Sequence, residues 1–573
     1  MLQELVSLFE KAYKVKGDSL ILDSYKLKTG VYIRINKEGK IEQQKIYDKK
    51  NENNHYDTYQ WFCKRDYLSD LLDMNKPIDP KKKIHSNNYM TLFFKKDIVI
   101  GDKKINYSKL EERILEYYDI LSDPQKKYKK DKKSLDLYNS ITEPINEENL
   151  TWCKEYVLKN LPNIISSLGK MDFNNYVKIF FDLPIEDYEI ESKRYLVPNL
   201  FNSNKYNKVI DNDIYGLTNN NMGLNAKKPY LEHKTMVNNL PCLIKSSDTL
   251  IHKKFFDWLG TRKQGCLYIK YDSDFIKGIK EKVTKGQESY YFLYLEQGKE
   301  AEIKNFDIIP VFRSNVNLEI YNYLRAEYKA EEGREEYPYI KQDTRIGLED
   351  YIDEIWFDKR LKPNYFQDPK NIKKIGQDLK NIIITTRQAL FNYFKLSDDN
   401  SIKNIIAKYG IKIVMLQLRD NSRSKAIKAY NLYVALVSQM GGKENMPGIL
   451  NETMDTLYSK IRENHADCDD DKQYYFLAGQ VVRYLLQKTK AKDKNQNHDV
   501  VNTYLECKND KRLKNEIRYT FVKYNHELRM RDISFNNALA MIQSYNPENT
   551  KVDMDMFLAG YLASSILYKK ENE

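Results

Sequence analysis

The sequence contains few cysteines and no clustered ones. Its six cysteines form no CxxC pair, so neither a zinc ribbon nor a framework of disulfide bonds is indicated. No GxxxxGK[ST], GxGxxG or GxSxG motif occurs, so phosphate-loop, dinucleotide and serine-nucleophile chemistries lack their usual signatures. No run approaches the roughly 18 apolar residues that a membrane-spanning helix needs. We therefore expect a soluble protein in a reducing cytoplasm, with no membrane contact.

The chain is long and carries a net positive charge. Its 573 residues suffice for two to four domains, and a hydrophobic content of 41% indicates a folded protein. The formal charge of +12 favours a polyanionic partner, although a lysine-rich protein can also be basic for solubility alone. The opening MLQELVSLFEKAY has helical spacing and two glutamates, unlike a secretory signal.

One segment, residues 74–96, combines turn residues, amides and positive charge. It reads MNKPIDPKKKIHSNNYMTLFFKK and holds six lysines and one aspartate, a net charge of +5. Its two prolines exclude a helix interior, and its apolar end predicts a β-strand. Asn87 and Asn88 carry the donors and acceptors that can pair with adenine, while lysines suit phosphate. A turn whose asparagines satisfy the local backbone explains the same residues.

Further basic segments follow this one. Residues 126–133 hold six lysines and predict an exposed loop that can touch a phosphate backbone. Residues 215–235, YGLTNNNMGLNAKKPYLEHKT, predict a second loop of amides and lysines. Residues 481–531 carry 13 basic and 6 acidic side chains, a net charge of +7, and their cations recur at spacings that can line one side of a helix. A merely solvated face explains that spacing equally well.

The order of the predicted elements gives the fold class. Alternation over residues 31–47 predicts a β-hairpin, residues 105–121 predict a helix, and residues 152–171 predict helical structure broken at Pro162. More strands are predicted within residues 265–275 and 290–312. Residues 327–358 are acidic, with 11 acidic and 4 basic side chains, and mark a candidate boundary. The helices predicted beyond that boundary cover residues 372–394, 401–409, 411–418 and 424–440, with further ones to residue 568.

The predicted fold is therefore α+β. A mixed α/β domain, residues 1–360, precedes an all-α helical bundle, residues 361–573. The bundle contains an internal echo, because YYFLAGQVVRYLL from Tyr474 and MFLAGYLASSILY from Met556 share FLAG and a similar apolar spacing. An alanine–glycine pair lets another helix approach closely, so we expect two core helices and not a repeated domain.

Catalytic chemistry finds little support in the sequence. The seven histidines have no paired spacing. The best metal candidate is HADCDDD, from His465 to Asp471, but these aspartates also suit the N-terminus of the apolar helix that follows. We therefore expect no catalytic residue, no cofactor and no metal. A metal-dependent nuclease acting on DNA through this motif is the alternative.

The stretches NKPIDPKKKIHSNNY, GLNAKKPYLEHKT, FLAGQVVRYLL and FVKYNHEL, in this order, resemble the large subunit of the type I-B CRISPR Cascade. This complex is an RNA-guided DNA surveillance machine of antiviral defence. The resemblance implies a non-catalytic subunit that recognises the protospacer-adjacent motif (PAM) in double-stranded DNA, aids strand separation and R-loop formation, and supports recruitment of a helicase-nuclease. The implied partners are CRISPR RNA, target DNA, the helicase-nuclease, and the backbone, 5′-end-capping and small subunits of Cascade.

The resemblance also assigns roles to residues and to the two domains. It implies PAM recognition and docking by the N-terminal domain, and a C-terminal bundle similar to a Cascade small subunit. Type I-B genes of this kind can also make a small subunit separately, by internal translation. An RNA-binding scaffold is a further alternative. The implied PAM or DNA contacts are Asn75, Lys76, Lys81, Lys82, Lys83, His85, Ser86, Asn87, Asn88, Tyr89, Asn219, Asn220, Asn221, Asn225, Lys227 and Lys228, and the implied nucleic-acid backbone contacts are Lys514, Arg518 and Lys523.

Overall fold

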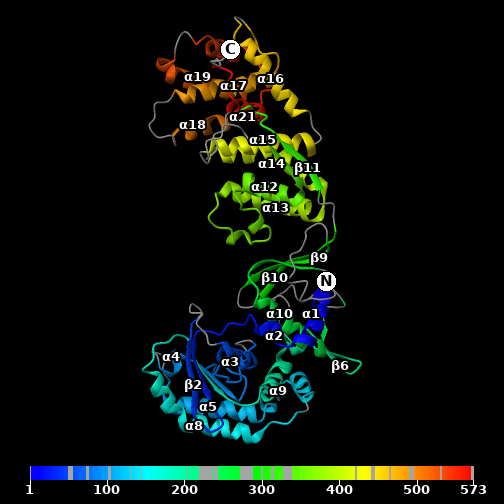
Figure 1. The fold of residues 1–573 in the computed structure, drawn as a ribbon, viewed down its shortest axis with the longest axis vertical. Coiled ribbons are helices and arrows are strands. Elements are labelled where there is room, and N and C mark those ends of the chain that lie inside the picture. Colours follow the sequence, from blue (N-terminus) through cyan, green and yellow to red (C-terminus); the bar gives the residue numbers. More distant parts are fainter. Residues whose placement is uncertain are drawn as a thin grey trace. The chain divides into compact units, whose positions relative to one another are not determined.

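The structure is a computed structural model, and it confirms the predicted fold class. A mixed sheet with helices forms the N-terminal region, and a run of helices follows it (Figure 1). The residues that the structure describes are 2–48, 56–72, 76–100, 105–129, 131–141, 143–201, 203–217, 237, 243–270, 288–297, 301–311, 315–326, 339–419, 422–440, 445–463, 466–488, 496–528 and 532–568.

Two compact units divide the chain. The N-terminal unit comprises Met1–Lys282 and Tyr291–Asp307, and the C-terminal unit comprises Val283–Tyr290 and Ile308–Glu573. The C-terminal unit therefore begins before the boundary predicted at residues 360/361. Helix α12 (Arg345–Phe357) belongs to it because Trp356 is buried there and donates its indole N–H to the carbonyl of Ala429 in α15 (Arg423–Met440), at 3.3 Å.

A four-stranded sheet of order β2-β1-β4-β3 organises the N-terminal unit. The predicted hairpin is confirmed as β1 paired antiparallel to β2, while β1 runs parallel to β4. The elements of this region are α1 (Leu2–Lys16), α2 (Ser19–Leu22), β1 (Gly30–Ile35), β2 (Ile41–Tyr47), α3 (Tyr56–Ser69), β3 (Thr91–Lys95), α4 (Lys96–Val99), α5 (Tyr107–Ser122), α6 (Gln125–Tyr128), α7 (Lys132–Asn139), α8 (Glu147–Leu168), β4 (Tyr176–Phe181), α9 (Ile185–Leu196), β5 (Lys208–Ile210), β6 (Asp213–Gly216), β7 (Ile244–Lys245), α10 (Ser246–Gly260), β8 (Gly265–Lys270), β9 (Tyr290–Gln297) and β10 (Ala301–Ile309).

Both faces of this sheet are covered, as the buried pattern of β1 requires. Val31, Ile33 and Ile35 join a core formed with α5 and α8 on one face. Tyr32 points to the other face and packs among the aromatic side chains of a second core that includes Phe62 of α3. Alternate side chains of one strand thus build two cores.

Helix α8 passes through Pro162, so the predicted break at this proline was wrong. Proline lacks an N–H, and the carbonyl of Leu158 one turn earlier consequently loses its helical partner. The hydroxyl of Tyr107, in α5, donates to that carbonyl at 3.3 Å. A hydrogen bond from another helix therefore satisfies the Leu158 carbonyl, which the proline leaves without a helical donor.

The C-terminal unit is built almost wholly of helices. Residues 401–418 form one helix and not two, because Gly410 is a packing position: a Cβ there would lie 2.4 Å from the ring of Tyr433. The elements of this unit are β11 (Asn315–Ile320), β12 (Ile340–Thr344), α12, α13 (Gln377–Leu396), α14 (Asp399–Arg419), α15, α16 (Met446–Lys460), α17 (Asp471–Gln487), α18 (Gln496–Leu505), α19 (Asp510–Tyr524), α20 (Ile533–Ser544) and α21 (Met554–Leu562).

The two FLAG segments pack against each other. A Cβ added to Gly479 of α17 would lie 2.2 Å from the carbonyl oxygen of Phe557, and one added to Gly560 of α21 would lie 1.9 Å from that of Phe476. The contacts on either side of this crossing show that the helices run in the same direction, because Tyr475 donates to the carbonyl of Lys551, before α21 begins, and Arg483 donates to that of Ala563, after α21 ends. The prediction of two core helices is confirmed, and each is the other's neighbour.

Candidate nucleic-acid interface

One buried carboxylate shapes the lysine-rich turn before β3. The side chain of Asp79 is fully buried and accepts hydrogen bonds from three main-chain N–H groups. The donors are Lys81 (2.9 Å), Lys83 (2.6 Å) and Ile84 (3.1 Å). Lys82 adopts a left-handed conformation, φ 57°, within this turn. Lys81 and Lys82 are exposed on this turn, and Lys83 is half-buried.

The two asparagines after this turn point into the protein. Asn87 and Asn88 are 1% and 0% exposed. Asn87 Nδ2 donates to the carbonyl of Asp70 at 2.8 Å. Asn88 Oδ1 accepts from the main-chain N–H of Met90 at 3.0 Å, and Nδ2 donates to the carbonyl of Tyr188 at 3.3 Å. Their predicted role as base readers is therefore contradicted in this conformation, since both side chains are buried and engaged with the backbone.

Their neighbours His85, Ser86 and Tyr89 are also buried, which contradicts direct DNA contact by them in this conformation. Ser86 Oγ lies 3.0 Å from the hydroxyl of Tyr117, and Tyr118 donates its hydroxyl to the carbonyl of Tyr89 at 3.2 Å. Burial lowers the pKa of His85 to about 4. The imidazole is therefore neutral at neutral pH and offers no cation to a phosphate.

Two lysines of the basic segments donate hydrogen bonds to main-chain carbonyls of other segments. Lys76 Nζ donates to the carbonyls of Asn199 and Phe201, both at 2.8 Å. Lys127 Nζ donates to the carbonyls of Lys76 (3.3 Å) and Pro77 (2.5 Å), and burial lowers its pKa to about 8. The predicted DNA contact by Lys76 is corrected accordingly, because its ammonium group is held by main-chain carbonyls.

The segment 125–133 is not the loop that its composition predicts. It forms α6 and the start of α7. Lys133 Nζ donates to the carbonyls of Lys205 (3.0 Å) and Asn207 (2.7 Å), so it also joins distant segments. The exposed lysines described here are Lys126, Lys129, Lys132 and Lys133, of which Lys126 pairs with Asp119 at 2.8 Å.

Some predicted site residues lie outside the described part of the chain. They are Asn75, the amide and lysine residues of the second loop, and one histidine of HADCDDD: Asn219, Asn220, Asn221, Asn225, Lys227, Lys228 and His465. The start of that loop, Tyr215 and Gly216, belongs to β6.

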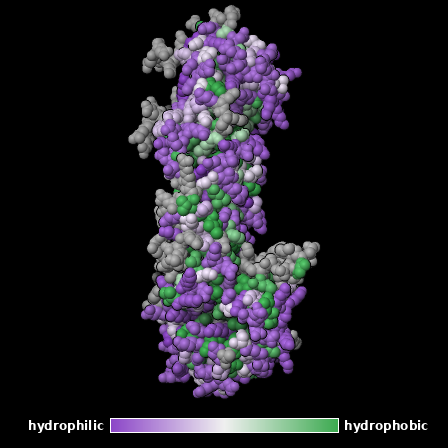
Figure 2. Space-filling model, turned by 90° about the vertical axis from the view of Figure 1, so that its right-hand side faces the viewer, coloured by the Kyte–Doolittle hydropathy of each residue, from purple (hydrophilic) through white to green (hydrophobic). Residues whose placement is uncertain are grey.

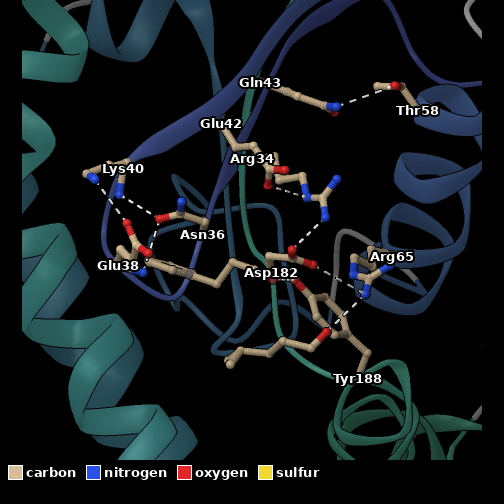
Figure 3. A network of polar contacts seen from close by, with 12 residues as sticks. Arg34, Asn36, Glu38, Lys40, Glu42, Gln43, Thr58, Arg65, Asp182 and Tyr188 are labelled. Atoms are coloured by element: carbon tan, nitrogen blue, oxygen red, sulfur yellow. Dashed lines mark hydrogen bonds and ion pairs between the residues drawn. The ribbon is translucent and has the colours of Figure 1, made fainter.

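A polar network lies at the carboxyl ends of the parallel strands β1 and β4, where α/β proteins often bind ligands (Figure 3). Arg34 forms ion pairs with Asp182 (2.5 Å) and Glu42 (3.1 Å). The guanidinium carbons of Arg34 and Arg65 lie 4.4 and 4.0 Å from the ring centroid of Trp61. Two cations thus face two carboxylates, and this balance gives the network no excess charge for an anion.

The aspartates of HADCDDD have structural partners. Asp470 is the N-cap of α17 and accepts the main-chain N–H of Gln473 at 2.8 Å, as the helix-terminus alternative predicts. Asp469 accepts the Gln473 side-chain amide at 3.0 Å, and Asp471 accepts the hydroxyl of Tyr545 at 3.0 Å. Among the residues that the structure describes, no group of three or more His, Cys, Asp or Glu side chains is arranged to hold a metal.

Helix α19 exposes four cations on one face. Leu513 and Ile517 are buried and fix the helix on its neighbours. The opposite side is exposed and includes Tyr519, 68% of which is accessible. Within α19 its exposed positions hold four cations and no carboxylate. This α19 basic face consists of Lys511, Arg512, Asn515, Arg518, Tyr519, Val522 and Lys523.

Lys514 does not belong to this face. Its Nζ lies 3.7 Å from the carboxylate of Asp510, donates to the carbonyl of Tyr545, and lies 5.4 Å from the ring centroid of Tyr474. The predicted backbone contact by Lys514 is corrected for this reason, while Arg518 and Lys523 are exposed.

The prediction from charged residues alone did not include Tyr519 and Asn515 of the α19 basic face. Tyr519 and Asn515 follow the same helical spacing as Arg518, so a count of all exposed positions at intervals of three and four would have found them. An exposed tyrosine among arginines supplies a surface on which a base can stack, and the cations attract phosphates.

Comparisons of the chain with protein-family models, curated proteins and solved structures gave no significant match. The surface in Figure 2 is mostly hydrophilic, with hydrophobic residues in separate patches. No helix in the described ranges is long and apolar enough to cross a membrane. The arrangement that favours a ligand class most clearly is the α19 basic face.

Proposed function

We propose that this chain is the non-catalytic large subunit of an RNA-guided type I-B Cascade, and that its C-terminal unit contacts the nucleic-acid backbone. The α19 basic face carries the proposal, because its four exposed cations and exposed tyrosine match a polyanion with stackable bases, while the carboxylate between them in the sequence, Glu516, is half-buried. The sequence resemblance supports the choice of complex. PAM recognition, strand separation and helicase-nuclease recruitment are part of the same proposal.

The burial of Asn87 and Asn88 changes which residues we assign to the duplex. In the lysine-rich turn, Lys81 and Lys82 are the exposed lysines. Ammonium groups bind phosphates without reading sequence, so we assign these two lysines to positioning on DNA. Lysine-to-glutamine changes at both should weaken binding to targets with and without a PAM by a similar factor.

The test uses the complex assembled by coexpression with its partner subunits and CRISPR RNA. Arg512, Arg518 and Lys523 are replaced together by glutamine, and binding to a matched DNA duplex is measured over a range of salt concentrations. Each lost phosphate contact should reduce the slope of log K against log salt by about 0.9. We therefore expect a slope smaller by about 2 to 3, and affinity lower by at least about tenfold at low salt.

A matched control removes the same charge from another helix of the C-terminal unit. Lys403, Lys408 and Lys412 are exposed on α14, and their triple glutamine variant should bind DNA nearly as the unaltered complex does. Equal losses in both variants would show a general effect of net charge and not a site on α19. Failure of the chain to assemble with CRISPR RNA and the Cascade subunits would contradict the proposed complex itself.

A further inference from the structure

Three tyrosines surround one carboxylate on the β11–β12 ribbon of the C-terminal unit. Tyr321 and Tyr339 are 47% and 52% exposed, and their ring centroids lie 5.1 Å apart. Tyr323 meets Tyr321 edge to face, with centroids 5.9 Å apart. The hydroxyl of Tyr321 donates to the carboxylate of Glu319 at 2.6 Å. We name these four residues the tyrosine–glutamate cluster.

The cluster is held in place by the backbone around it. The hydroxyl of Tyr323 donates to the carbonyl of Glu319 at 3.1 Å. Gln439 of α15 donates its amide to the same carbonyl at 2.9 Å and accepts the main-chain N–H of Glu319 at 3.3 Å. Since both strands are paired in register, the exposed rings have a defined spacing before any partner arrives. Such preorganisation lowers the cost of binding.

The chemistry of the cluster suits a cation. The hydrogen bond that Tyr321 donates to Glu319 raises the pKa of Tyr321 to about 12, so the phenol stays neutral and its ring face carries the negative part of the aromatic quadrupole. Lys341, opposite Glu319 in the register, pairs instead with Asp343 at 3.0 Å. These charged side chains, Glu319, Lys341 and Asp343, sum to a net charge of −1.

The surroundings in the sequence point the same way. Residues 327–358 carry 11 acidic and 4 basic side chains, and they include one strand of the ribbon. This charge repels phosphates and attracts basic protein segments. A nucleic acid, which we assign to the α19 basic face, is therefore disfavoured here.

We propose that the tyrosine–glutamate cluster is a docking site for an arginine or lysine side chain from an extended, basic segment of a partner protein. The cation lies over the exposed tyrosine rings, with Glu319 as its counter-ion. This contact goes beyond the proposed function and does not rest on it, because it needs neither guide RNA nor DNA.

The test measures binding of a fluorescent peptide, acetyl-GRGRGRG-amide, to the full-length chain by anisotropy at low salt. Its control peptide has citrulline in place of each arginine, which keeps the shape and removes the charge. We expect tighter binding of the arginine peptide. Tyr339→Leu and Glu319→Gln should each weaken it about two- to fivefold, while Tyr339→Phe should retain it. Tyr519→Leu, on α19, should leave it unchanged.

Several outcomes would overturn the proposal. One is equal binding of the arginine and citrulline peptides. Another is unchanged arginine-peptide binding in both Tyr339→Leu and Glu319→Gln, with circular dichroism showing that the variants are folded. An oligothymidylate of twelve nucleotides is the third probe. If Tyr339→Leu weakens binding of this probe and not of the peptide, the cluster is a base-stacking surface.

Discussion

Replacing Gly560 by alanine tests the contact between α17 and α21 directly. The new methyl group would lie 1.9 Å from the carbonyl oxygen of Phe476 and 2.7 Å from its carbonyl carbon. Real Cβ atoms essentially never approach closer than 3.0 Å, so the two helices must separate locally by about 1.1 Å. The obstructing atoms belong to a helix backbone, and no side-chain rotation can relieve the clash.

The separation weakens many contacts at once. A gap of about 0.5 to 1 Å forfeits a quarter to a half of the dispersion energy of each atom pair it opens. The side chains around the crossing, including Phe476, Leu477, Phe557 and Leu558, are fully buried. We therefore expect Gly560→Ala to reduce the free energy of unfolding by about 3 kcal/mol or more, at the upper end of overpacking effects.

Urea denaturation followed by circular dichroism measures this change. Gly260→Ala is the control, because nothing lies within 4 Å of a Cβ at that helical position and alanine favours a helix. Gly479→Ala should act like Gly560→Ala, and the double variant should cost less than the sum, since one separation relieves both clashes. A Gly560→Ala variant within about 0.5 kcal/mol of the unaltered chain would refute this reasoning.

Two further predictions concern the N-terminal unit. Burial lowers the pKa of His85 to about 4. Between this value and the ordinary histidine pKa, the unfolded chain binds a proton at this residue and the folded chain does not, so the free energy of unfolding falls as the pH drops through this range. His85→Gln should remove about 2 kcal/mol of the stability loss between about pH 7.5 and about pH 5, measured by urea unfolding at each pH; an unchanged pH profile would contradict this. Tyr107→Phe should cost about 1 kcal/mol through the lost bond to the Leu158 carbonyl, and less in a Pro162→Ala background, where the alanine N–H restores the helical bond. Equal costs in both backgrounds, again from urea unfolding, would argue against the compensation.

The sequence predicted helices and strands well where apolar residues recur at regular helical or strand spacing. The hairpin of β1 and β2 follows from alternation, and α5 and α15 follow from helical spacing. Pro162 and Gly410 misled the prediction because each breaks a helix on local grounds alone. Their compensating partners, Tyr107 and Tyr433, are distant in the sequence, and spacing rules do not include them.

The candidate site was harder to predict than the fold. Asn87 has the same donors and acceptors whether it faces a base or a carbonyl, and only burial decides between them. Lys76 and Lys127 look like phosphate ligands in a basic sequence, yet the structure uses both to bind main-chain carbonyls. Arg518 lies on an exposed helical face because Ile517 is buried, and that part of the pattern was visible in the sequence.

The contact between Gln439 and Glu319 has a consequence for assembly. A side-chain amide that donates to one peptide carbonyl and accepts from the same residue's N–H reproduces the hydrogen bonds of a neighbouring strand. The outer edge of β11 is therefore occupied at that position, and a strand from another molecule finds no free pair of groups there. Gln439 thus blocks edge-to-edge pairing of β11 at Glu319, while the aromatic face of the ribbon remains exposed.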